Sequence, residues 1–186
     1  MEQGRALDNY FVRDADSLRQ SAQACLAEGS YSGNDKAIEL LQTVLATEII
    51  CVLRYTRISV SEACLKNVQI GAEFQEQAND ERRHMVTVAR RIEELGGEPN
   101  FAPKGLVSRT AVAHGDSENF SEMAQYNLIA ERSIIEHYKG LIAYFKEHDP
   151  ASRELLETIL QDEENHTADM QDLLMTRGDH NISYTN

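Results

Sequence analysis

The chain has 186 residues, which is enough for one domain with a sizeable core. Its formal net charge of −13 argues against a nucleic-acid-binding protein, because such proteins normally present a basic face. The chain has three cysteines, Cys25, Cys51 and Cys64, which lack metal-type spacing and suit a reducing compartment. The sequence contains no long apolar run. We therefore expect no disulfide framework, no signal peptide, no membrane span and a cytoplasmic location.

Four long helices are expected after an N-terminal extension. Residues 1–35 form the extension, which we expect to be partly helical or disordered. After it, apolar residues recur at the three- and four-residue spacing of amphipathic helices. The predicted helices span approximately residues 35–65, 68–95, 120–148 and 151–175. They make up a predicted bundle domain over residues 36–176, and residues 177–186 are expected to form a flexible tail.

Capping and turn residues set the ends of these helices. Asn34 and Asp35 are of the types preferred at a helix N-cap, and Gly96-Gly97 is a strong stop signal. Pro150 suits the first turn of the last helix. Residues 97–119 lack sustained helical periodicity and form a long connection with room for a short turn of helix.

The lengths of the connections predict the topology. Only a few residues separate the first helix from the second and the third from the fourth, so each pair should pack antiparallel. About 20 residues separate the second helix from the third. That length of extended chain can cross the ~40 Å of a long helix. The prediction is an all-α antiparallel four-helix bundle with one long crossover between its second and third helices.

One motif occurs twice in the chain: a Glu, a Tyr seven residues later, and then Asp-Glu-x-x-His. The first copy is Glu48, Tyr55, Asp80, Glu81 and His84, and the second copy is Glu131, Tyr138, Asp162, Glu163 and His166. The first Glu precedes the Glu of Glu-x-x-His by 33 residues in one copy and by 32 in the other. The near-equal spacing indicates two similar helical hairpins that place their polar residues at the same height.

This motif has the residue types and spacing of a two-metal site. Residues three apart lie on nearly the same face of a helix, so Glu81 and His84 can reach one point in space. One Glu from each of two helices and a Glu-x-x-His from each of the other two form the donor set of carboxylate-bridged dinuclear centres. Four buried carboxylates without a cation would repel one another, whereas two divalent ions carry a matching charge. The predicted metal ligands are Glu48, Glu81, His84, Glu131, Glu163 and His166.

These residues give the chain a resemblance to the ferritin-like superfamily, closest to the bacterioferritin type, over roughly residues 36–176. The stretches Ala46-Thr47-Glu48, Leu95-Gly96-Gly97-Glu98-Pro99 and Ala130-Glu131-Arg132 also look like that group. The resemblance implies a ferritin-like four-helix bundle with two Fe ions per subunit, for which Mn or Zn are possible substitutes. It also implies that Glu81 and Glu163 bridge the two ions and that Tyr55 is the catalytic tyrosine near them.

The resemblance implies a ferroxidase that oxidises Fe(II) to Fe(III) with dioxygen or hydrogen peroxide, for iron storage and detoxification. It also implies a homo-oligomer, either a shell of 12 or 24 subunits or a smaller assembly. The negative net charge and the lack of a long apolar run predict no nucleic acid and no membrane as partner. Bacterioferritins bind haem through a Met directly after the first bridging Glu. Arg82 stands at that position here, so we expect no haem.

Two other functions remain open from the sequence. One is a di-metal redox enzyme without storage, such as a rubrerythrin-like peroxide reductase, a manganese catalase or an oxidase. Rubrerythrins usually add a Glu three residues after the ligand of the third helix, where this chain has Ile134. The other is a non-catalytic assembly or cargo protein, against which the intact ligand set argues.

Other polar residues near the predicted ligands have predicted roles of their own. Asp80 either orients a ligand or lines an entry route for iron, and Asn127 is a candidate partner of a ligand on the same helix. We assign Tyr138 to packing, Cys51 to a buried thiol and His137 to the surface.

Overall fold

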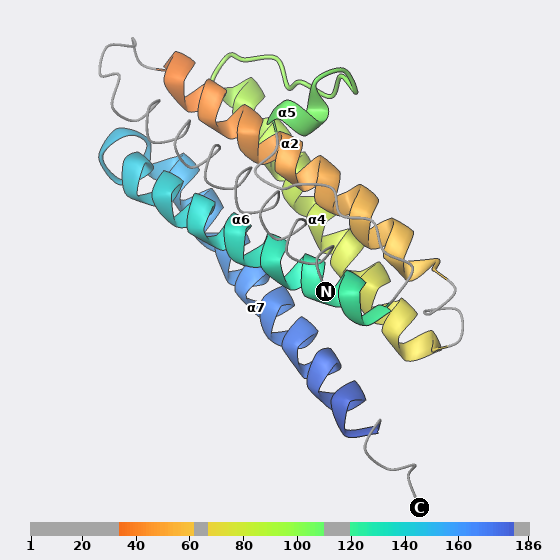
Figure 1. Ribbon diagram of the computed structural model, residues 1–186. Helices are drawn as coiled ribbons and strands as arrows, with labels where there is room; N and C mark the ends of the chain where they lie inside the picture. Colours follow the sequence, from red (N-terminus) through yellow and green to blue (C-terminus); the bar gives the residue numbers. More distant parts are fainter. Residues whose placement is uncertain (1–33, 62–66, 110–119, 181–186) are drawn as a thin grey trace, which may run out of the picture.

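The computed structural model describes residues 34–61, 67–109 and 120–180. These residues form four long helices and one short one, and they contain no strand (Figure 1). The helices are α2 (Asn34–Ser59), α4 (Val68–Glu94), α5 (Leu106–Arg109), α6 (Phe120–His148) and α7 (Pro150–His180). The predicted all-α fold is confirmed.

Two helical hairpins pack side by side to make the bundle. α2 packs along α4, and α6 packs along α7. The hairpins meet where α4 contacts α7 and α2 contacts α6. In Figure 1, α4 and α6 run in one direction and α2 and α7 in the other, so the end of α4 lies far from the start of α6. This arrangement requires the long connection that the sequence predicts, and α5 belongs to that connection and packs on α2.

Local hydrogen bonds account for the ends of α4 and for the start of α7. The side chain of Asn67 accepts a hydrogen bond from the backbone nitrogen of Ile70 at 3.4 Å, which caps the start of α4. Gly96 follows the end of α4 with a φ of +88°, a conformation that favours glycine. Asp149 accepts a hydrogen bond from the backbone nitrogen of Ser152 at 3.2 Å and so caps α7.

Two helix ends differ from the sequence prediction. α2 ends at Ser59, several residues before the predicted end near residue 65. The hydroxyl of Ser59 donates to the carbonyl of Thr56 at 2.8 Å, and such local bonds compete with the continuation of a helix. α7 continues to His180, so the first residues of the predicted tail are helical. Gly178 weakens a helix by about 1 kcal/mol but does not end this one. Residues 1–33 of the predicted extension and residues 181–186 lie outside the described residues.

A charged network fixes the end of α4 against the start of α7. Arg91 donates from Nη2 to both carboxylate oxygens of Asp149 at 2.9 Å, and from Nε to the hydroxyl of the buried Ser152 at 3.0 Å. Burial acts to raise the pKa of Asp149, but the hydrogen bonds from Ser152 and Arg91 outweigh it and lower that pKa. The network joins the two hairpins about two turns from His84 on α4.

His137 is partly buried beside α2. Its Nε2 is 3.3 Å from the hydroxyl oxygen of Thr43 on α2, and its ring centroid is 5.9 Å from that of Tyr138. The prediction of an ordinary surface residue was incomplete, because the sequence around His137 does not reveal that α2 lies beside it. Burial lowers the pKa of His137 to about 4.

Protonation of His137 is expected to destabilise the bundle. An unperturbed histidine has a pKa of about 6.5, so the unfolded chain binds a proton between pH 6.5 and pH 4 that the folded chain does not. Stability should therefore fall as the pH is lowered through this window. We expect His137→Gln to reduce that fall by roughly 2 kcal/mol, which allows for the partial exposure of the ring. Urea unfolding at pH 7 and pH 4 measures it, with the exposed His148→Gln as control, and equal pH dependence in both variants would contradict it.

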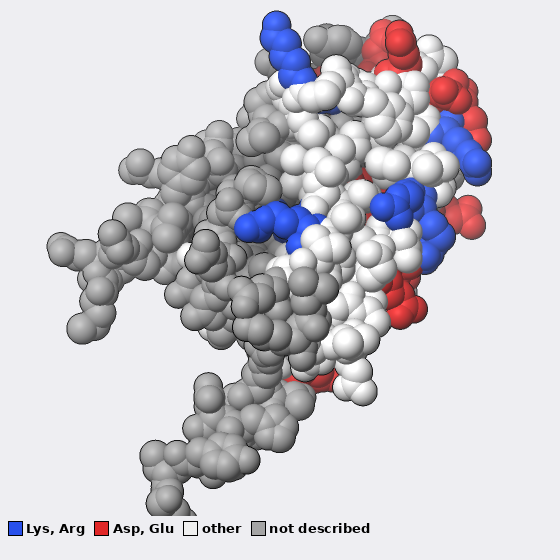
Figure 2. Space-filling model, turned by 90° about the vertical axis from the view of Figure 1, so that its right-hand side faces the viewer, with Lys and Arg blue, Asp and Glu red and all other residues white. Residues whose placement is uncertain are grey.

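The face of the molecule shown in Figure 2 has charged and uncharged areas. Acidic and basic side chains are interspersed along one edge of the described surface, and a broad, largely uncharged area lies beside them. Large apolar side chains that are exposed on α2, on α4 and in the turn after α2 are Leu53, Val60, Val68 and Val86. Single exposed apolar side chains of this kind are normal on a protein surface. Within the described residues, no helix has both the length and the apolar character required to cross a membrane.

Candidate metal centre

The six predicted ligands meet inside the bundle. Glu48 comes from α2, Glu81 and His84 from α4, Glu131 from α6, and Glu163 and His166 from α7. Each lies near the middle of its helix, where amphipathic helices direct one stripe of residues inward. None of the six is more than 5% exposed. The chain therefore places four carboxyl groups and two imidazoles in its interior.

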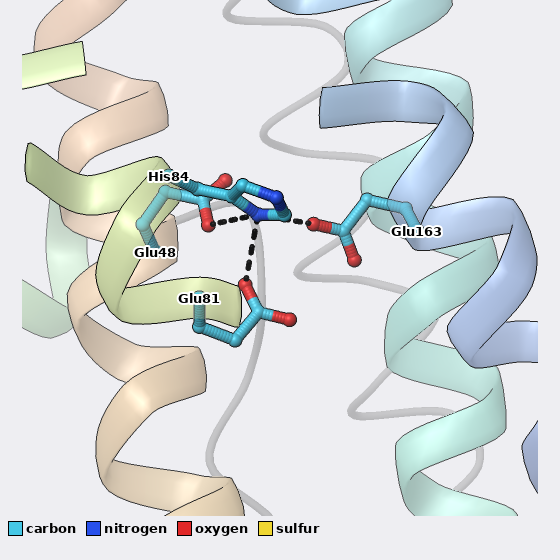
Figure 3. A group of neighbouring side chains, drawn as sticks. All are labelled: Glu48, Glu81, His84 and Glu163. Carbon is cyan, nitrogen blue, oxygen red and sulfur yellow. Dashed lines mark ion pairs between the residues drawn. The ribbon is translucent and has the colours of Figure 1, made fainter. Parts of the chain in front are cut away.

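The donor atoms form two groups that share one residue. The first group is Glu48, Glu81, His84 and Glu163, and the second is Glu131, Glu163 and His166. Within each group the donor atoms lie within 4.8 Å of one another. Figure 3 shows the first group, in which side chains from three helices point toward the Nδ1 atom of His84.

Glu81 and Glu163 each reach both histidines. Glu81 lies 3.6 Å from Nδ1 of His84 through one oxygen and 3.2 Å from Nδ1 of His166 through the other. Glu163 lies 3.5 Å from Nδ1 of His84 and 3.6 Å from Nδ1 of His166, again through different oxygens. Each of these two carboxylates therefore lies between the two histidines.

The atoms that face the centre lack hydrogen-bond partners within the described structure. They are Glu48 Oε2, both carboxylate oxygens of Glu81 and of Glu163, Glu131 Oε2, His84 Nδ1 and His166 Nδ1. A buried polar atom without a partner costs free energy, and such atoms are rare in native structures. Oxygen and imidazole nitrogen donors are suited to Fe, Mn and Zn ions. The residues present therefore fit two divalent metal ions.

Two buried carboxyl groups and both imidazoles of the centre have raised pKa values when no metal is bound. Burial is the largest cause that raises the pKa of Glu81 and of Glu131, followed by the charge of Glu48 for Glu81 and of Glu163 for Glu131. Burial acts to lower the pKa of His166, but its contacts with Glu163 and Glu81 outweigh this and raise it to about 11. The pKa of His84 is raised in the same way. The metal-free centre thus binds protons, which metal ions displace.

Two aspartates hold the outer nitrogens of the two histidines. Nε2 of His84 on α4 is 3.0 Å from Asp162 on α7, and Nε2 of His166 on α7 is 3.5 Å from Asp80 on α4. Each Asp therefore contacts the His of the other motif, which directs Nδ1 of that ring toward the centre. From the sequence, this role was one of two predicted for Asp80 and was not predicted for Asp162. The signal was the repeated Asp-Glu-x-x-His, in which the two Asp occupy equivalent positions.

Two tyrosines bind the two glutamates that lie outside the Glu-x-x-His pairs. Each tyrosine binds the glutamate of the other copy of the motif. The hydroxyl of Tyr55 donates to Oε1 of Glu131, and the hydroxyl of Tyr138 donates to Oε1 of Glu48. The prediction that Tyr138 serves packing was therefore incomplete, because this residue also binds a candidate ligand. Burial, followed by the nearby carboxylates, raises the pKa of both phenols, which keeps them protonated as donors.

The other predicted residues come from α2, α4 and α6. Asp80 lines a polar pocket of about 360 Å³ that also includes His166. Asn127 is 2% exposed, and its amide nitrogen donates no hydrogen bond within the described structure. Cys51 is a buried free thiol, and burial followed by the charges of Glu81 and Glu131 raises its pKa.

The chain is similar to two curated proteins of different activity. It is 26% identical over 157 residues to the 3-demethoxyubiquinol 3-hydroxylase of Francisella philomiragia, which covers 82% of this chain and 73% of that protein. It is 29% identical over 132 residues to the bacterioferritin of Desulfovibrio desulfuricans, which covers 70% of each chain.

A solved structure and a family model agree with the fold. The structure of a bacterioferritin-related protein from Bacteroides fragilis, described as a dodecameric thioferritin, matches with a TM-score of 0.75 and 23% identity, over 90% of this chain and 99% of that one. This similarity shows the fold. The family model described as a ferritin-like domain matches residues 38–177, a segment that includes most of each long helix and both copies of the motif. The chain therefore belongs to the ferritin-like family.

Proposed function

We propose that this protein is a ferroxidase, which oxidises Fe(II) to Fe(III) with dioxygen or hydrogen peroxide for iron storage and detoxification. The observation that carries the proposal is the set of buried donor atoms that face one another without hydrogen-bond partners. Two Fe(II) ions are the substrate and lose one electron each to the oxidant. The 29% identity to a bacterioferritin supports this assignment.

The geometry suggests a role for each residue. Glu48 and His84 would hold one ion, Glu131 and His166 the other, and Glu81 and Glu163 both. Asp162 and Asp80 would fix the imidazoles, and the two tyrosines would restrict the rotation of Glu48 and Glu131. Tyr55 is the proposed catalytic tyrosine, because its ring lies 6.2 Å from that of His166 and its hydroxyl reaches Glu131.

We further propose a homo-oligomer in the cytoplasm. The dodecameric structural relative supports assembly. Cytoplasmic location is supported by the cysteine usage, which suits a reducing compartment. We retain the division into an extension over residues 1–35, a bundle over 36–176 and a short tail as part of this proposal.

A second candidate is a di-metal oxidoreductase without iron storage. The similarity to a hydroxylase is the observation that favours it. The described pocket beside the centre is lined by acidic, amide and imidazole side chains, which suit a cation better than an apolar organic substrate. This chemistry supports the ferroxidase as the first candidate.

Iron retention distinguishes the two candidates. Excess Fe(II) is added in air to the purified protein, which is then desalted before its iron is counted. We expect tens of iron atoms or more per chain if a mineral is stored. About two per chain would contradict storage and favour the second candidate, with peroxide consumption as the next assay.

A further inference from the structure

We propose that Arg83 is a positioning residue that makes the two halves of the dinuclear centre unequal. It holds Asp80, the partner of His166, and so weakens metal binding in the half that contains His166 relative to the half that contains His84. This role rests on the metal centre of the proposed function, but it depends neither on the oxidant nor on storage of the product. Arg83 itself would touch no metal.

The two copies of Asp-Glu-x-x-His differ in the residue that stands three positions after the Asp. This residue is Arg83 after Asp80 and Asn165 after Asp162. Residues three apart share a face of a helix, so this position decides which side chain the Asp can pair with on its own helix. Nη1 of Arg83 donates to Oδ1 of Asp80. Within the described residues, Asp162 pairs with no Lys or Arg.

The two aspartates contact their histidines at different distances. Oδ2 of Asp162 lies 3.0 Å from Nε2 of His84, a normal hydrogen-bond length, whereas Oδ2 of Asp80 lies 3.5 Å from Nε2 of His166. A carboxylate that accepts a hydrogen bond from the outer ring nitrogen fixes the ring and makes the inner nitrogen a stronger ligand. Because Asp80 also neutralises a guanidinium, it supports His166 less than Asp162 supports His84.

The two donor groups differ in the same direction. The group around His84 contains three carboxylates, and the group around His166 contains two. A site with more carboxylates attracts a cation more strongly. The half that contains His84 should therefore fill first as metal is added, and the ion pair of Arg83 with Asp80 should widen the difference between the halves.

Stepwise binding of Mn²⁺ tests this role. The full-length protein is stripped of metal, and Mn²⁺ is added at pH 7 while calorimetry and electron paramagnetic resonance of the free ion measure two dissociation constants. Glu131→Gln, which alters only the group around His166, identifies the step that belongs to that half. The test variant is Arg83→Asn, which gives the first copy the residue of the second. The control is Arg82→Asn, which removes the same charge from an exposed neighbour that donates to Asn79 at 2.8 Å.

We expect two unequal steps in the wild type and loss of the weaker one in Glu131→Gln. In Arg83→Asn, the dissociation constant of the weaker step should fall about three- to tenfold relative to Arg82→Asn, and the tighter step should not change. This effect is smaller than the roughly 10- to 100-fold cost of losing a histidine's partner outright, because Asp80 keeps part of its contact in the wild type. Arg83→Lys, which keeps a cation beside Asp80, should bind both ions as the wild type does.

Each other result has a distinct meaning. Two equal steps in the wild type, or equal constants in Arg83→Asn and Arg82→Asn, would overturn this role of Arg83 while leaving the metal centre in place. Absence of Mn²⁺ binding by the wild type would overturn the metal centre and this role together. Two unequal steps in a protein that does not oxidise Fe(II) would contradict the ferroxidase activity alone.

Discussion

Replacement of Glu163 by alanine is expected to remove metal binding from both halves of the centre. Glu163 belongs to both donor groups, and its two oxygens face His84 and His166 separately. The variant leaves each half with fewer donors and reduces the negative charge that balances two divalent ions. Fe(II) oxidation should fall to the rate of iron in buffer, and about two metal ions per chain should be lost.

Thermal unfolding with and without Mn²⁺ provides a second measurement of the same prediction. A metal present at about 100 times its dissociation constant stabilises the folded state by about 2.7 kcal/mol, which corresponds to a Tm rise of roughly 5–10 °C. We expect this rise in the wild type and in Glu164→Ala, whose side chain is exposed and pairs with Lys139. Glu163→Ala should fold without metal and show almost no rise. A full rise in that variant would contradict the assignment of Glu163.

Replacement of Asp162 by alanine is expected to lower metal affinity by a factor of about 10 to 100, the usual effect of losing the partner of a metal-binding histidine. Asp162 contacts Nε2 of His84 at 3.0 Å, which keeps Nδ1 directed at the centre. Without this contact the ring is free to rotate, although Asp162 itself would touch no metal. Titration of the metal-free protein with Mn²⁺ at pH 7 measures the change.

Two further variants make this second prediction specific. Asp80→Ala should have a smaller effect, because Asp80 lies 3.5 Å from His166 and also pairs with Arg83. Gln161→Ala removes the exposed neighbour of Asp162 and should leave affinity unchanged. If Asp162→Ala binds metal as tightly as Gln161→Ala, the contact with His84 does not position the ligand.

The repeated motif explains how much of the candidate site could be predicted. A three-residue spacing within one helix fixes the relative direction of two side chains, so Glu81 and His84 must share a face wherever the helix lies. The position of a Glu on an apolar stripe likewise implies burial. The same local rules predicted the bounds of α6 and the start of α4. They failed at Ser59, where a side-chain hydrogen bond competes with the helix, and at Gly178, where α7 continues although glycine disfavours a helix.

The sequence by itself determined the elements, their order and the six inward side chains of the centre. Only the tertiary structure decided which residues support that centre. Tyr138 binds Glu48 across 90 residues, Asp162 contacts His84 across 78, and His137 meets Thr43 across 94. Each pair joins helices from different hairpins, so it depends on their axial register and rotation, which no local pattern encodes. The amide oxygen of Gln77 is a similar case: it is buried and accepts no hydrogen bond from the residues that the structure describes, which only the packed helices reveal.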